Sequence, residues 1–273
     1  MTKLVPSLQL CTIFAALVED TCGVHHGLHD RKLFAAKLVA HAADLGHDSL
    51  LDYYYRLRYD DPGGAELTRL IEALLVHETY FFRELAALRQ LVDGHLSDVI
   101  RARGRARVWS AACSTGEEPL TMAMLLDARG LLDRVELIGT DVSAPVIARA
   151  ALGQHRRRSL RDDPPGELAA RYLEVSPGGV VVAPRILAAV RFQALNLLDV
   201  AAVRALGRFD VILCRNVLIY FRDERVTRVI DQLAGSLAPG GLLAVGVAES
   251  LVRFGTALVC EERARSLFYR SAT

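Results

Sequence analysis

The chain has 273 residues, of which 52% are hydrophobic, and a formal net charge of +1 at neutral pH. This composition is sufficient for a sizeable core, and the near balance of charge gives no overall attraction to nucleic acid or to an anionic membrane. No apolar run approaches the ~20 residues of a membrane helix, and the N-terminal 23 residues fit an amphipathic helix better than a secretion signal. Five cysteines without a CxxC pair are typical of free thiols, so we expect a cytoplasmic globular protein.

The first third of the chain has the periodicity of helices. Apolar residues recur at helical spacing from Leu8 to about Leu91, which predicts four or five short helices. The segment 93–106 is polar and basic and is predicted to be a linker. The predicted organisation is therefore a helical domain over 1–92, a linker over 93–106 and a second domain over 107–273.

The second domain alternates apolar strand-like runs with helices, which is typical of a parallel sheet covered on both faces. A terminal hairpin is expected at 258–262 and 266–270. Prolines, glycines and the run Val180-Val181-Val182 predict an inserted β-subdomain over 153–189. The expected strands are 107–112, 135–141, 190–196, 209–216 and 241–249, and the expected helices are 118–129, 144–152 and 223–237.

The stretch AACSTGEEPL, residues 111–120, joins the first expected strand to the helix after it. Small residues and Gly116 permit a tight turn at the carboxyl end of a strand, where open α/β sheets bind ligands. A phosphate site is a poor match there, because Glu117 and Glu118 repel anions and neither GxGxxG nor GxxxxGK is present. A cationic or hydroxyl-bearing ligand fits better, although both glutamates equally fit a role as helix-dipole partners.

Other expected strands also end in polar residues. Asp141 ends the second strand, where it would bind a ribose or merely cap the next helix. Asn196 closes another strand, and the buried run 209–214 leads into Arg215, Asn216 and then Tyr220. Since the carboxyl ends of parallel strands share one edge, these residues together indicate a ligand site.

The helical part adds the stretch HETYFFRE, residues 77–84. Three consecutive aromatics are ordinary core residues in an isolated helix. Here the polar residues Glu78, Thr79 and Arg83 flank them, which favours an arginine placed at the mouth of the site.

HETYFFRE, WSAACSTGEEPLTMAM, GTDVS, NLLD and CRNVLIYF resemble, in order and spacing, the CheR family of chemotaxis receptor methyltransferases. The resemblance runs from about Leu8 to the end and is densest from His77 to Gly246. It implies a Rossmann-like class I S-adenosylmethionine-dependent methyltransferase fold with a helical N-terminal domain and a small inserted β-subdomain. The implied reaction is methylation of glutamate side chains on the cytoplasmic signalling domains of chemoreceptors or chemotaxis-like receptors, with S-adenosylhomocysteine as the other product.

The resemblance also implies roles for individual residues. Arg83 and Tyr220 would be catalytic, beside the methyl group and the incoming glutamate, and Asp141 would hold the ribose. Exposed arginines of the insert would dock an acidic receptor helix. The implied cofactor site comprises His77, Thr79, Arg83, Glu118, Asp141, Asn196, Leu197, Arg215 and Asn216, and the implied docking patch comprises Arg156, Arg157 and Arg158.

The chain departs from the family pattern at His77, where the family has Asn, and at Gly246-Val247-Ala248-Glu249, where the family has GHSE. These changes motivate one alternative, a module of the same fold that binds S-adenosylmethionine or S-adenosylhomocysteine without transferring methyl. A methyltransferase for small molecules is a second alternative.

A compact group of Cys22, His25, His26 and His29 has some potential to bind zinc. It lacks a second ligand pair at the spacing of structural zinc sites, so we expect a turn between helices and no metal.

Overall fold

The structure, a computed structural model, describes residues 4–27, 30–161, 164–263 and 266–271. Its internal contacts divide the chain into two units. The first unit runs to Val76 and also takes in Tyr220–Arg225, and the second comprises His77–Ile219 and Val226–Thr273. The division after Val76 lies earlier than the predicted division after residue 92, so that the HETYFFRE stretch belongs to the second unit.

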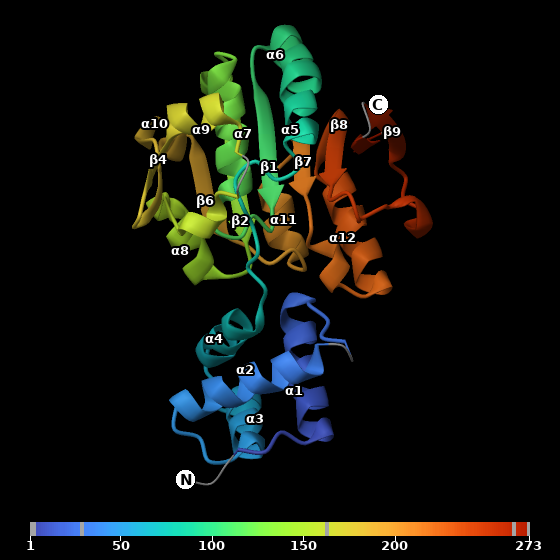
Figure 1. Cartoon of the computed structure of the whole chain (residues 1–273). Helices are drawn as coiled ribbons and strands as arrows, with labels where there is room; N and C mark the ends of the chain where they lie inside the picture. Colours follow the sequence, from blue (N-terminus) through green and yellow to red (C-terminus); the bar gives the residue numbers. More distant parts are fainter. Residues whose placement is uncertain (1–3, 28–29, 162–163, 264–265, 272–273) are drawn as a thin grey trace. The chain divides into compact units, whose positions relative to one another are not determined.

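The first unit contains helices α1 Leu8–Cys22, α2 Arg31–Asp44, α3 Leu50–Tyr59 and α4 Ala65–Leu74 (Figure 1). Ser7 caps α1 and Ser49 caps α3, each through a hydroxyl that accepts a backbone N–H of the first turn.

Polar contacts join the helices of the first unit. The buried carboxylate of Glu66 lies 2.9 Å from His41 Nε2 and accepts a hydrogen bond from the Tyr53 hydroxyl. Lys37 donates to the carbonyls of Leu74 and Leu75 at the end of α4. Two polar residues of α2, Lys37 and His41, therefore serve the packing of this unit.

A seven-stranded sheet forms the centre of the second unit, with the order β6-β2-β1-β7-β8-β10-β9. The first five strands in this order are parallel, while β10 runs antiparallel to both β8 and β9. The strands are β1 Ala106–Ala111, β2 Val135–Asp141, β6 Val190–Ala194, β7 Phe209–Cys214, β8 Leu237–Val245, β9 Val259–Arg263 and β10 Ser266–Arg270. The α/β fold with a mostly parallel sheet is thus confirmed.

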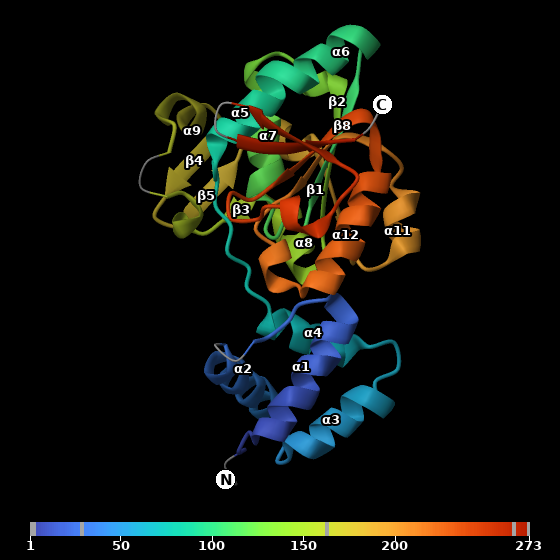
Figure 2. The ribbon, with the colours of Figure 1, turned by 90° about the vertical axis from the view of Figure 1, so that its right-hand side faces the viewer.

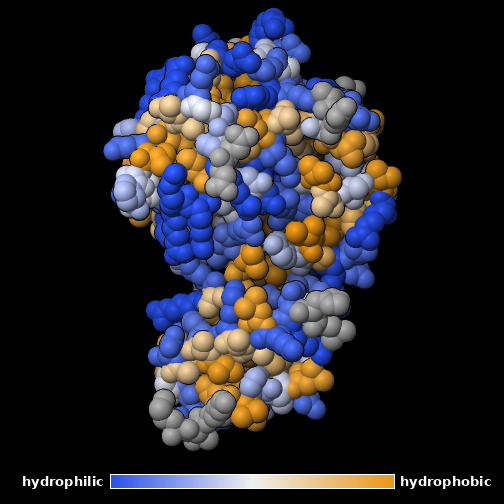
Figure 3. All heavy atoms as spheres, in the orientation of Figure 1, coloured by the Kyte–Doolittle hydropathy of each residue, from blue (hydrophilic) through white to orange (hydrophobic). Residues whose placement is uncertain are grey.

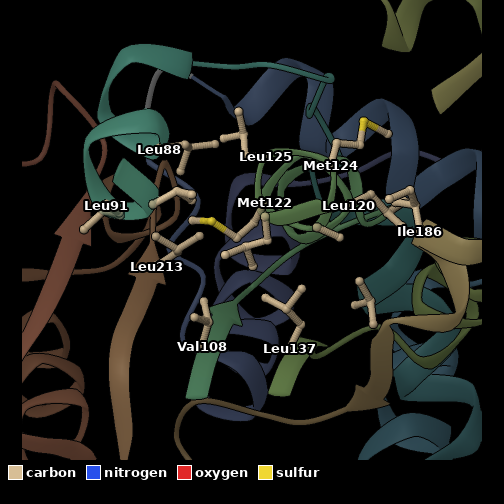
Figure 4. Close-up of a cluster of buried hydrophobic side chains, with 14 of the residues drawn as sticks. Leu88, Leu91, Val108, Leu120, Met122, Met124, Leu125, Leu137, Ile186 and Leu213 are labelled. Carbon is tan, nitrogen blue, oxygen red and sulfur yellow. The ribbon is translucent and has the colours of Figure 1, made fainter. Parts of the chain in front are cut away.

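Successive residues of the strands point to opposite faces of this sheet, and apolar residues are buried on both faces. Val108 and Leu137 belong to a core cluster with α7 Glu117–Ala128, while the next residues, Trp109 and Ile138, point to the opposite face and are equally buried. Figure 4 shows Met122 of α7 among leucine and valine side chains of the strands. Helices α11 Val200–Ala205 and α12 Asp223–Gly235 lie on the side of the sheet away from α7 (Figure 2).

The expected linker over 93–106 is instead mostly helical, in η1 Leu91–Leu96, which has π-helical geometry, and α6 Ser97–Arg103. These two helices pack on the core, because Leu91, Val92 and Leu96 of η1 are buried and Val99 and Ile100 of α6 pack partly buried against it. The basic residues Arg101 and Arg103 of α6 are exposed, and they led to the prediction of a linker.

Residues 153–189 contain a separate three-stranded antiparallel sheet, in the order β3-β5-β4. Gly179 is required between the last two strands because its φ is +144° and a Cβ there would lie 2.4 Å from the carbonyl oxygen of His155. The remaining elements are α5 Leu85–Gln90, η2 Leu132–Arg134, α8 Ala144–Leu152, β3 Gln154–His155, η3 Arg157–Ser159, α9 Gly166–Tyr172, β4 Leu173–Ser176, β5 Gly179–Val182, α10 Pro184–Ala188, η4 Leu218–Tyr220 and η5 Val252–Phe254.

Within the parts of the chain that the structure describes, no helix has both the length and the apolar character needed to cross a membrane. On the face seen in Figure 3, hydrophilic residues cover much of the second unit, and hydrophobic residues form smaller groups between them.

Candidate functional site

The turn after β1 is tightly folded against the neighbouring strands. Ala112, Ser114 and Gly116 all have positive φ. A Cβ on Gly116 would lie 2.9 Å from the Phe192 ring, so only glycine fits without displacing β6. The Ser114 hydroxyl oxygen is buried and has no hydrogen-bond partner among the described residues.

Asp141 lies next to this turn, at the carboxyl end of β2. Its Oδ2 accepts the Ser114 N–H at 2.9 Å and its Oδ1 accepts the Ser143 N–H at 3.1 Å. Burial raises the pKa of Asp141, while these backbone hydrogen bonds and the nearby His77 lower it, and burial prevails. Each carboxylate oxygen can accept further hydrogen bonds, so Asp141 is able to receive the hydroxyls of a ligand.

A buried arginine joins three separate segments at the same edge of the sheet. Arg215 Nη1 donates to Glu118 Oε2 at 2.8 Å, and Nη2 donates to Glu84 Oε2 and to the Arg83 carbonyl, both at 2.9 Å. The Arg215 side chain is only 1% exposed. Burial alone would lower the pKa of Arg215, but the carboxylates of Glu118 and Glu84 raise it above its ordinary value.

This bridge leaves a net negative charge and an unused donor. Two carboxylates face one guanidinium, and the second oxygen of Glu118 accepts a hydrogen bond from Ser110 Oγ at 2.7 Å. Arg215 Nε is buried and lacks a hydrogen-bond partner in the described chain. Buried polar atoms without partners are rare and costly, so this edge has the features of a site completed by a polar ligand that carries positive charge.

The HETYFFRE stretch reaches this edge through its backbone. Phe82 N–H donates to Thr121 Oγ1 of α7 at 3.1 Å, and both Phe82 and Glu84 have positive φ. The half-buried Arg83 guanidinium lies 5.4 Å from the centre of the Tyr80 ring and donates to the Glu78 carbonyl at 3.4 Å. Thr79, predicted to contact the cofactor, is half-buried in the same stretch.

The end of β6 is attached directly to Asp141. Leu195 N–H donates to the Asp141 carbonyl at 2.8 Å, and the Asn196 side-chain oxygen accepts the Leu198 N–H at 3.0 Å. Leu197 is buried here. The predicted residues Asn196 and Leu197 therefore follow the strand beside Asp141.

Glu249, which sequence reasoning did not select, holds the ends of β7 and β8 together. Its Oε2 accepts the Asn216 N–H at 2.5 Å and the Gly246 N–H at 2.8 Å. A Cβ on Gly246 would lie 2.6 Å from Asn216 Nδ2. The two residues that this segment shares with the GHSE pattern, Gly246 and Glu249, thus make these contacts, whereas Val247 and Ala248 are exposed.

A second missed contact links the insert to the start of α7. His155 Nδ1 of β3 lies 3.1 Å from Glu117 Oε1, and both side chains are 1% exposed. Burial opposes ionisation of Glu117, but the hydrogen bond and charge of His155 together with the hydrogen bonds of Thr115 and Ser159 outweigh it, so the pKa of Glu117 is lowered. No spacing in the sequence signals this pair, because its members lie on different elements.

The structure places the predicted docking arginines Arg156, Arg157 and Arg158 on the exposed surface of the insert. Nearby in the chain, Arg161 lies 4.2 Å from the centre of the Tyr80 ring and pairs with Glu78 at 2.7 Å. Tyr220 ends η4 and is grouped with the first unit, where its carbonyl accepts the His25 N–H at 2.7 Å.

The Cys22–His29 segment shows structural contacts for three of its four candidate ligands. Cys22 is buried, His25 lies 2.9 Å from Glu19, and the His26 ring packs 4.7 Å from that of Phe34. His29 lies outside the described residues.

The strand order reverses between β1 and β7, and the bridged residues surround that point, where open α/β sheets bind nucleotides. With an acidic residue ending the second strand and a glycine turn after the first, these features define the Rossmann-like class I S-adenosylmethionine-dependent methyltransferases. The family described as CheR methyltransferase, SAM binding domain, matches residues 77–265. The chain belongs to this family, and its cofactor is S-adenosylmethionine.

Curated relatives extend the similarity over most of the chain. Chemotaxis protein methyltransferase 1 of Pseudomonas aeruginosa is 34% identical, over 88% of this chain and 89% of the relative. Chemotaxis protein methyltransferase 2 of Vibrio cholerae is 36% identical, over 84% of this chain and 81% of the relative. A third relative, Probable biofilm formation methyltransferase WspC of Pseudomonas aeruginosa, is 38% identical, over 73% of this chain and 47% of the relative.

Proposed function

We propose that this enzyme transfers the methyl group of S-adenosylmethionine to glutamate side chains in the cytoplasmic signalling domains of chemoreceptors or of chemotaxis-like signalling proteins. The product is a glutamyl methyl ester. The observation that carries the proposal is the Arg215 bridge, which joins the FFRE, STGEE and CRN segments of the family pattern at one edge of the sheet. The names of the chemotaxis relatives support the choice of substrate.

The residues at this edge suit S-adenosylmethionine, which supplies a methyl group activated by a positively charged sulfur. We assign Asp141 to the ribose hydroxyls, because its buried carboxylate retains acceptor capacity beside the turn at Gly116. The net negative charge of Glu84, Glu118 and Arg215 favours the cationic part of the cofactor. His77, Thr79, Asn196, Leu197 and Asn216 complete the proposed cofactor site.

No strong general base is required for this reaction. A glutamate substrate is ionised at neutral pH, so its oxygen is already a nucleophile. The protein's contribution is to align this oxygen and to exclude water from it, which can lower the barrier by several kcal/mol. We propose that Arg83 orients the carboxylate through its planar donors and that Tyr220 donates one hydrogen bond at the transfer point.

Substrate docking is assigned to the exposed patch Arg156, Arg157 and Arg158. A patch of like charge on the insert attracts an acidic helix and accelerates its association. Replacing all three by glutamate should raise KM for the receptor while leaving the Kd for S-adenosylmethionine unchanged. Receptor kinetics that do not change would contradict this assignment.

The proposed reaction is tested by incubating the full chain with methyl-labelled S-adenosylmethionine and receptor cytoplasmic fragments from the same cell. Label that is released from the receptor by alkali identifies the methyl ester. Tight cofactor binding without ester formation would instead support a binding module. Turnover on small molecules after deletion of residues 154–189 would support a small-molecule methyltransferase.

A further inference from the structure

The segment Tyr220–Arg225, which carries the proposed catalytic tyrosine, is grouped with the N-terminal unit by its contacts. It follows β7 of the second unit after only a few residues. The N-terminal unit therefore makes the contacts that define where this short segment lies.

Glu19, in the last turn of α1, is the centre of those contacts. Its Oε1 forms an ion pair with Arg222 Nε at 2.9 Å, and its Oε2 lies 2.9 Å from His25 Nδ1. Arg225 Nε lies 3.9 Å from the same Oε1. The Glu19 side chain is only 12% exposed, so these interactions are screened much less than those of a surface pair.

The His25 backbone completes the connection, because its N–H donates to the Tyr220 carbonyl at 2.7 Å. Arg222 Nε–H donates to His25 Nδ1 at 3.2 Å, so Glu19, His25 and Arg222 form one polar cluster. The Glu19 carboxylate thus contacts both His25 and Arg222. His25 fixes the Tyr220 backbone, and Arg222 lies two residues after Tyr220.

We infer that Glu19 is a positioning residue for methyl transfer, acting on Tyr220 through Arg222 and His25. This inference rests on the proposed function, in which Tyr220 donates a hydrogen bond at the transfer point. The orientation of Tyr220 would then depend on Glu19, and alignment errors of about 1 Å can reduce turnover by up to about a hundredfold.

Asp20 provides a matched control on the same turn of α1. Its Oδ1 pairs with Arg225 Nη2 at 3.1 Å, but its side chain is 75% exposed. Glu19→Gln and Asp20→Asn each remove one negative charge next to the same segment. Only Glu19→Gln removes the carboxylate that holds both Arg222 and His25.

The experiment measures kcat for receptor methylation and the Kd for S-adenosylmethionine with the full chain. Glu19→Gln should lower kcat about tenfold with an unchanged Kd, and Asp20→Asn should change kcat less than twofold. The double variant Glu19→Gln/Tyr220→Phe should be no slower than Tyr220→Phe alone, because both changes act through one side chain. Amide hydrogen exchange of residues 220–225 should be faster in Glu19→Gln than in Asp20→Asn.

Each other outcome has a distinct meaning. If Tyr220→Phe is slow but Glu19→Gln retains wild-type kcat, the inference fails and the proposed function stands. Additive losses in the double variant, or a raised Kd in Glu19→Gln, would also overturn the inference. A wild-type kcat in Tyr220→Phe would overturn both the inference and the proposed role of Tyr220, and a wild-type protein that forms no ester would overturn the proposed function. Should Glu19→Gln fail to fold, Arg222→Gln tests the same contact from its more exposed side.

Discussion

Two arginines lie at opposite ends of the parallel strands and differ in their hydrogen bonding. We call the end where the strands begin the amino edge and the end where they finish the carboxyl edge. At the amino edge, Arg107 donates through Nε to Glu136 and through its Nη atoms to Glu136 and to the carbonyls of Leu206 and Arg208. Each of its three nitrogens has an acceptor. At the carboxyl edge, Arg215 is more deeply buried and its Nε has no acceptor among the residues described. The amino edge is closed by the chain itself, whereas the carboxyl edge retains capacity for a ligand.

Aspartates make the same contrast. Asp210, at the amino edge, contacts Arg103 and accepts the Arg107 N–H at 2.8 Å, so that it fixes the start of β7. Asp141, at the carboxyl edge, accepts the backbone N–H groups of Ser114 and Ser143, and burial raises its pKa. Asp210 thus pairs with an arginine of the chain, whereas the Asp141 carboxylate keeps acceptor capacity for the ribose that we propose it binds.

The largest expected effect is that of removing the buried guanidinium. Arg215→Met leaves Glu84 and Glu118 facing each other without a counterion, which should lower the free energy of unfolding by about 3–5 kcal/mol. Arg107→Met at the amino edge is the matched control and should cost no more than about 1 kcal/mol, because its ion pair is partly exposed. Urea unfolding of both variants measures the difference, and equal losses would remove the distinction between the edges.

Replacing Asp141 and Asp210 one at a time by asparagine should separate an effect on cofactor binding from an effect on the stability of the fold. Asp141→Asn should raise the Kd for S-adenosylmethionine about 10–100-fold, which is the value of hydrogen bonds to a charged group. Asp210→Asn should leave that Kd unchanged and lower the melting temperature instead. Calorimetric titration beside thermal unfolding tests the pair, and normal cofactor binding by Asp141→Asn would show that the ribose is held elsewhere.

Cofactor affinity should depend on pH through Asp141. Its pKa is raised in the free protein by burial, and hydroxyl donors from a ribose would favour the ionised form. Binding then requires loss of a proton at acid pH, so the Kd should increase by up to about tenfold per pH unit below the raised pKa. The increase should begin above the ordinary carboxyl value of 3.8. A similar pH dependence in Asp141→Asn would assign the effect to another group.

The smallest effect is expected for Glu136, the partly exposed partner of Arg107 at the amino edge. The hydrogen bond from Arg107 lowers the pKa of Glu136, so this carboxylate stabilises the fold above its unfolded value of 4.5, and the contribution is lost as pH falls through the lowered pKa. Because Glu136 is 46% exposed, Glu136→Gln should cost only about 0.5 kcal/mol at pH 7. Urea unfolding at pH 7 and at acid pH should show this difference shrinking, and a constant difference would refute the electrostatic origin.

The sequence predicted the features that depend on local patterns. Apolar runs located β1, β2 and β7 to within two residues, and polar residues at strand ends led to the prediction of Asp141, Arg215 and Asn216 as site residues. The start of β8 was placed late, at residue 241, because Pro239 and Gly240 indicate a turn. In the structure β8 begins at Leu237, and the pairing with β7 shifts register between Phe209 and Val211.

Contacts between distant segments were beyond prediction from one sequence. Glu84, Glu249 and His155 have no local signature, because each acts on a partner from another element. The helical nature of 93–106 was hidden for a different reason. Its π-helical start alters the spacing of the buried residues Leu91, Val92 and Leu96, so the pattern lacks the period of an α-helix.

The most direct test of the carboxyl edge as the cofactor site is a crystal structure of the full chain with S-adenosylhomocysteine. We predict ribose hydroxyls within hydrogen-bond distance of the Asp141 carboxylate and the ligand beside the Arg215 bridge. A ligand bound elsewhere, with Asp141 and Arg215 making only the contacts described above, would contradict the account.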